Sequence, residues 1–85
     1  MSFIIDVSVY EDYKLLIELE NGNSIILDME SKLDTLRFSI LKNYDCFKSV
    51  KTDGCSVYWK NGMVRLSFNE ILQMLRTVTY LSLVG

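Results

Sequence analysis

Residues 12–29, DYKLLIELENGNSIILDM, decide the fold that we expect for this chain. Apolar and polar side chains alternate on both sides of Asn21-Gly22, with Leu16 as the exception, as in two strands that each bury one face. The side chains expected on the buried face are Leu15, Ile17, Leu19, Ile25 and Leu27. Because Asn and Gly accept positive φ angles, Asn21-Gly22 predicts a two-residue primed turn. The stretch therefore predicts an antiparallel hairpin.

The segment before this hairpin adds a third predicted strand. Residues 3–9 have a period of two, in which an apolar set alternates with Ile4, Asp6 and Ser8. The apolar set is expected on one side of the strand and consists of Phe3, Ile5, Val7 and Val9. Residues 10–12 form a short polar link into the hairpin. The first three strands are therefore expected to form a meander.

Residues 30–50 lose the period of two. Four apolar residues there have the spacing of a helix face among weak helix formers, namely Leu33, Leu36, Ile40 and Leu41. We expect short helical turns separated by irregular backbone. A second turn is predicted at residues 44–47, with Asn43 as its cap and Phe47 in the core.

The residues from 47 onward predict a second meander and one helix. The dipeptides Asp53-Gly54 and Asn61-Gly62 divide residues 47–66 into three predicted strands. Ser67 and Glu70 have the spacing of a capping box that starts a helix. The apolar stripe of that helix is Phe68, Ile71, Leu72, Leu75 and Val78.

The pattern as a whole predicts a single α+β domain over residues 1–85. We expect two layers, with antiparallel strands in two meanders, short helices and one C-terminal amphipathic helix. The pattern leaves open whether the two meanders merge in one sheet or stack as two. At 85 residues the margin of stability should be small, so a partner that covers apolar surface would help.

Composition argues against several classes of function. Nine basic and eleven acidic side chains give a net charge of −2 without a run of Lys or Arg, so we expect no nucleic-acid partner. Folding could still assemble a basic patch from Lys48, Lys51 and Lys60, although a solvated surface explains them more simply. The chain has no His and four glycines, each at a turn or a terminus, so we predict neither an enzyme nor a cofactor.

The sequence also bears on location and on metal binding. Neither a targeting signal nor an apolar run long enough to span a bilayer is present, so a cytoplasmic protein without a membrane partner is expected. Cys46 and Cys55 are then expected to be reduced, half-buried apolar residues. Two thiols without His donors do not make a zinc site, so no metal is predicted.

Some apolar residues are candidates for an interaction surface. The indole of Trp59 is expected at the edge of the core with its ring buried, and an exposed anchor is the alternative. Met74 lies off the helix stripe, and no charge follows Arg76 in an apolar tail that predicts an extra strand or a docking segment. The complete candidate surface is Trp59, Met74, Tyr80, Leu81 and Leu83.

The segments DYKLLIELENG, ILD, FKSV and VYWKNG, in this order, resemble a small, mostly prokaryotic family, domain of unknown function family 2442. The resemblance covers residues 3–75, and it departs after Gly62, where Arg65 stands at the place of a usual Asp and Ser67 supplies the helix cap without a Pro. It implies a compact two-layer α+β fold and no catalytic residues. Some members are proposed to be antitoxins of small toxin-like proteins.

Two functions follow as expectations. The first is a small protein-interaction domain, an antitoxin-like partner of a small neighbouring protein, which binds through a sheet edge, the Trp59 region or the apolar C-terminus. The alternative is a structural or ligand-sensing domain that associates with itself as a homodimer.

Overall fold

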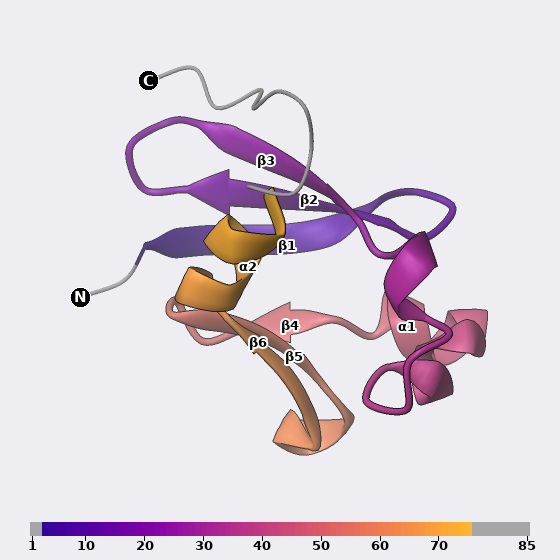
Figure 1. Ribbon diagram of the computed structural model, residues 1–85. Helices are drawn as coiled ribbons and strands as arrows, with labels where there is room; N and C mark the ends of the chain where they lie inside the picture. Colours follow the sequence, from indigo (N-terminus) through magenta and orange to yellow (C-terminus); the bar gives the residue numbers. More distant parts are fainter. Residues whose placement is uncertain (1–2, 76–85) are drawn as a thin grey trace.

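The computed structural model describes residues 3–75 of the chain, and its fold is α+β (Figure 1). The strands of the first sheet are β1 (Ile4–Glu11), β2 (Lys14–Leu19) and β3 (Ser24–Asp28). Those of the second are β4 (Lys51–Thr52), β5 (Ser56–Trp59) and β6 (Val64–Ser67). The helices are α1 (Tyr44–Lys48) and α2 (Phe68–Leu75), with 3₁₀ turns η1 (Glu30–Lys32), η2 (Ser39–Lys42) and η3 (Lys60–Gly62).

The first sheet confirms the predicted meander and hairpin. Its strand order is β1-β2-β3, and both neighbouring pairs are antiparallel. Leu15 lies opposite Leu27, and Ile17 lies opposite Ile25. All four side chains are buried, as the alternation predicts.

At the start of β1, the prediction of which residues point toward the core is wrong. Ile4 is 2% exposed, whereas Ile5, expected on the buried side, is 61% exposed. The pairing with β2 shifts between Ile4 and Asp6, so one extra residue of β1 is accommodated there. Such a bulge changes which residues point inward. Val7, beyond the bulge, again packs against the core.

The turn between β2 and β3 also differs from the prediction. The Leu19 amide donates to the Asn23 carbonyl at 2.9 Å, which leaves a loop of three residues instead of two. Gly22 has a φ of +89°, but Asn21 does not have a positive φ. This is the loop length at which an ordinary turn is followed by a glycine in the left-handed region. Asn21 instead accepts a hydrogen bond from the Asn23 amide.

The segment between the sheets forms short helical turns, as predicted. Asn43 caps α1 by accepting a hydrogen bond from the Cys46 amide at 3.1 Å, and Phe47 is fully buried. The predicted apolar face is wrong in part, because Leu36 is 95% exposed and Ile40 is 42% exposed. The segment breaks into separate 3₁₀ turns, and such pieces do not keep one continuous helical face.

The second sheet follows the order β4-β5-β6 and is separate from the first, which answers the question of merged or stacked meanders. Strand β4 is shorter than predicted because α1 extends to Lys48. The capping box is confirmed: the Glu70 amide donates to Ser67 Oγ, and the Ser67 amide donates to Glu70 Oε1, both at 3.1 Å. Ile71 and Leu75 of α2 are buried, as the stripe predicts.

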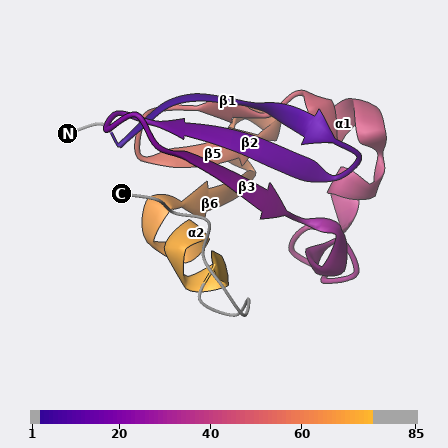
Figure 2. The same ribbon diagram turned by 90° about the horizontal axis from the view of Figure 1, so that it is seen from above.

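One apolar core joins the two sheets and the helices. The amides of Phe3 and Ile4 donate to the Gly54 carbonyl at 2.8 and 2.9 Å, which connects β1 to the turn of the second sheet. The second sheet and both helices lie on the buried side of the first sheet (Figure 1). Seen from above, no part of residues 3–75 covers the other side (Figure 2). Among the residues that the structure describes, one face of the first sheet is therefore uncovered.

Candidate functional site

The side of the first sheet that residues 3–75 leave uncovered is one candidate surface, and we call it the outer sheet face. Side chains alternate across a strand, so it is formed by the residues between the buried ones. Its members are Asp6, Ser8 and Tyr10 of β1, Lys14, Leu16 and Glu18 of β2, and Ser24, Ile26 and Asp28 of β3.

The centre of the outer sheet face is apolar. Leu16 lies directly opposite Ile26 on β3, and on its other side it lies opposite Ser8. Ile26 is 43% exposed, and Leu16 is half-buried. Tyr10 and Ile5 are also exposed on this sheet. Adjacent exposed apolar side chains of this kind are typical of interaction surfaces.

Acidic side chains surround this apolar centre. Asp6 and Glu18 are paired across β1 and β2, one row from Leu16, and Asp28 lies opposite Lys14 at the other end. Lys14 is the single cation of the outer sheet face, and its Nζ lies 3.8 Å from Glu11. The face thus combines an apolar centre with an excess of negative charge.

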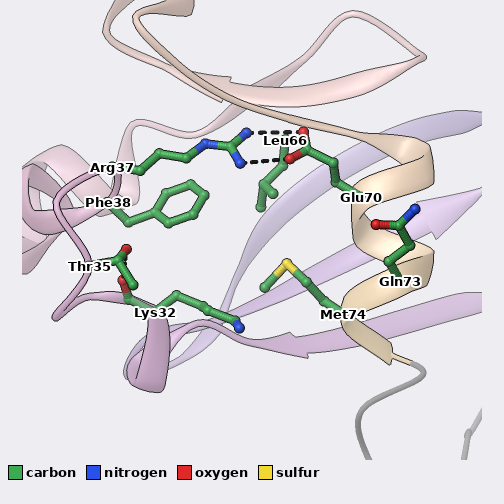
Figure 3. Close-up of a pocket in the computed structure, with 8 residues that line it drawn as sticks. All are labelled: Lys32, Thr35, Arg37, Phe38, Leu66, Glu70, Gln73 and Met74. Carbon is green, nitrogen blue, oxygen red and sulfur yellow. Dashed lines mark hydrogen bonds and ion pairs between the residues drawn. The ribbon is translucent and has the colours of Figure 1, made fainter.

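A second candidate lies between α2 and the segment at 32–38 (Figure 3). This pocket has a volume of about 370 Å³. Phe38 from the segment and Leu66 from β6 give it apolar walls, and Gln73 and Met74 line it from α2. A neighbouring pocket of about 580 Å³ is also lined by Lys32 and Met74, so the two form one depressed region along α2.

An ion pair closes the upper end of the pocket in Figure 3. Arg37 Nη1 lies 2.6 Å from Glu70 Oε2, and Arg37 Nη2 lies 3.0 Å from Glu70 Oε1. The pKa of Glu70 is lowered from 4.5 to about 2. The largest cause is the hydrogen bond from Arg37, and the second is the hydrogen bond from the Ser67 amide. The same pairing raises the pKa of Arg37. Both groups are therefore charged at neutral pH and hold the pocket wall together.

A related pair stabilises the turn of the second sheet. Arg65 Nη1 lies 2.7 Å from Asp53 Oδ2, while Asp53 Oδ1 accepts hydrogen bonds from the amides of Cys55 and Ser56. The pKa of Asp53 lies well below its usual range, chiefly because of the hydrogen bond from Arg65 and secondly because of the hydrogen bond from the Cys55 amide. Arg65 thus has a structural partner in this chain.

The structure corrects one of the predicted interaction residues and places another. Trp59 is 1% exposed, and its Nε1 donates to the Phe47 carbonyl at 2.9 Å, so the buried ring is confirmed and the indole is not a contact for a partner. Met74 packs against the core and lines both pockets along α2. Tyr80, Leu81 and Leu83 lie outside the residues that the structure describes.

The three lysines considered for a basic patch have different surroundings. Lys48 lies 3.6 Å from Asp45 and over the ring of Tyr44. Lys51 and Lys60 line one small pocket of about 190 Å³ beside β5. Of these three lysines, only Lys51 and Lys60 line a common pocket. Of the two cysteines, Cys46 is half-buried as expected, whereas Cys55 is exposed.

Residues 3–75 contain neither a metal-binding cluster nor a helix that could span a membrane. No group of three or more His, Cys, Asp or Glu side chains there is placed to hold a metal ion. None of the helices in that part of the chain has the length and apolar character needed to cross a membrane.

Sequence reasoning missed both features that stand out in this structure. The alternation in β2 and β3 indicates which side chains point away from the core, but it does not indicate that no part of residues 3–75 covers them. Arg37 and Glu70 are 33 residues apart, so no local spacing could connect them.

Residues 3–75 define an α+β domain with two stacked antiparallel meanders, and no element of this range covers the outer sheet face. No protein-family model, no curated protein and no solved structure matches this chain.

Proposed function

We propose that this protein is a small protein-interaction domain, the antitoxin-like partner of a small neighbouring protein, and that it binds through the outer sheet face. The observation that carries this proposal is the cross-strand pair of Leu16 and Ile26 at the centre of a sheet face that no part of residues 3–75 covers. Association removes such apolar surface from water, at about 25 cal/mol for each Å² buried. The resemblance to domain of unknown function family 2442, of which some members are proposed to be antitoxins, is compatible with the same function.

Edge strand β3 extends this surface. Within residues 3–75 it pairs only with β2, so no other strand of that part of the chain uses its outer backbone groups, to which a partner could add a strand. Ile26 is on β3. A partner could therefore use the backbone of β3 and the apolar centre together.

The test is to recover the tagged full-length chain from its own host and measure the mass of the complex. The double variant Leu16→Thr/Ile26→Thr removes the apolar centre but keeps β-branched residues that suit strands. We expect the wild type to carry a stoichiometric small protein, and the double variant to bind it at least tenfold more weakly, which corresponds to about 1.4 kcal/mol.

Met63→Thr is the matched control, because Met63 is 83% exposed and precedes β6 in the second sheet. It should bind the partner like the wild type. For the antitoxin-like role, the recovered protein should arrest growth when expressed alone, and co-expression of the wild type should relieve the arrest. A wild-type homodimer without a second protein, or full binding by the double variant, would contradict the proposal.

A further inference from the structure

Charge is distributed unevenly along this chain. Residues 1–31 carry seven acidic side chains and one basic one, a formal charge of −6. Residues 32–85 carry four acidic and eight basic side chains, a formal charge of +4, and the two parts give the net charge of −2. The first sheet, which occupies residues 4–28, therefore lies wholly within the acidic part of the sequence.

The acidic groups of the outer sheet face flank its apolar centre. Asp6 and Glu18 lie on neighbouring strands in one row, and Asp28 extends from β3 near the opposite end. The apolar pair Leu16 and Ile26 occupies a row between them. Because Lys14 pairs with Glu11, no cation of the face itself is opposite Asp6 or Glu18.

This pattern disfavours a second copy of the chain as the occupant. A two-fold contact brings the same surface of both copies together, so carboxylates would face carboxylates around the apolar centre. Like charges across an interface cost several kcal/mol. The same carboxylates repel nucleic-acid phosphates.

We propose that the occupant of the outer sheet face is a basic protein surface, with an apolar anchor that contacts Leu16 and Ile26 and with Lys or Arg side chains that pair with Asp6, Glu18 and Asp28. This inference rests on the proposed function and names the chemistry of its partner. Complementary charge speeds association and selects the partner, while the apolar centre supplies affinity.

A pair of peptides tests this chemistry on the isotope-labelled full-length chain, followed by amide NMR. One peptide alternates Leu with Lys, and the matched peptide alternates Leu with Glu. We expect the basic peptide to shift the amides of β1, β2 and β3 and to bind at least tenfold more tightly than the acidic one. That preference should shrink between about 0.1 M and 1 M salt, where the Debye length falls from about 10 Å to about 3 Å.

Two triple variants distinguish the effect of the carboxylates on the outer sheet face from the effect of the protein's net charge. Asp6→Asn/Glu18→Gln/Asp28→Asn neutralises the outer sheet face and should remove the preference for the basic peptide. The second variant, Asp12→Asn/Glu20→Gln/Glu30→Gln, removes the same charge from nearby positions outside the face. It should retain most of the preference for the basic peptide. Equal binding of the two peptides, shifts confined to the second sheet, or equal effects of the two variants would overturn the inference.

The inference and the proposed function can fail separately. If the cellular complex is lost in Leu16→Thr/Ile26→Thr but unchanged in the face-neutralised variant, the interaction domain stands and the basic partner is wrong. If the complex is insensitive to Leu16 and Ile26, the proposed site itself is wrong. A wild-type dimer that dissociates in the double variant would show that a second copy occupies the face.

Discussion

At the scale of single residues, the pair of Arg37 and Glu70 connects parts of the chain that are far apart in sequence. Its two hydrogen bonds join the segment between the sheets to the first turn of α2 (Figure 3). Glu70 also completes the capping box with Ser67. One carboxylate therefore both starts the helix and attaches the segment that packs beside it.

Glu70→Gln tests the contribution of this charge, since Gln still fits a capping box. The folded pKa of Glu70, about 2, lies below its ordinary value of 4.5, so its stabilisation is present above pH 4.5 and is lost as pH falls toward 2. Both partners are partly exposed, so we expect a loss of about 1 kcal/mol at pH 7. Urea unfolding at pH 7 and at pH 2 should show the wild type and variant converging.

Glu20→Gln makes the same chemical change in the turn after β2. Glu20 makes no ion pair within residues 3–75, so this variant should lose less than about 0.5 kcal/mol at neutral pH. A loss from Glu70→Gln that is as large at pH 2 as at pH 7 would show that the charge is not the cause.

At the scale of elements, two neighbouring leucines on β2 have opposite roles. Leu15 is fully buried, whereas Leu16 is on the outer sheet face. We expect Leu15→Ala to lower the free energy of unfolding by about 3 kcal/mol, because it leaves a cavity in the core. Leu16→Ala should cost less than about 1 kcal/mol. Urea unfolding of both variants measures the difference, and equal losses would contradict the register of β2.

The extent to which the sequence predicts this fold differs between elements. The hairpin of β2 and β3 and the stripe on α2 are predictable because one face of each is buried against the core, which imposes a period on the residues. The bulge at Ile5 is not predictable, because Ile4 and Ile5 are both apolar and only pairing with β2 selects the one that points inward. Leu36 is exposed, against the prediction, because separate turns have no common face.

The candidate site was less predictable than the fold. Alternation identifies the residues of the outer sheet face, but whether that face is covered depends on where α2 and the second sheet pack. Trp59 was offered as a contact because its type is common in interfaces. Its position depends instead on a hydrogen bond to Phe47, twelve residues away, which no local pattern indicates.

At the scale of the whole molecule, both sheets share one core, so we expect them to unfold together. Trp59 is the single tryptophan and lies in the second sheet, so its fluorescence reports on that sheet. Far-ultraviolet circular dichroism reports on all strands and helices. The two signals should give the same urea midpoint, as in a two-state transition. Separate midpoints would show that the sheets are independent units.

The order of the two sheets along the chain has a consequence for biosynthesis. Strands β1, β2 and β3 are contiguous in the chain and can pair while the rest is still on the ribosome, at about 5–20 residues per second. Their apolar underside stays open until the second sheet and α2 have been translated. During that interval the carboxylates of the outer sheet face would keep neighbouring nascent chains from associating with that face.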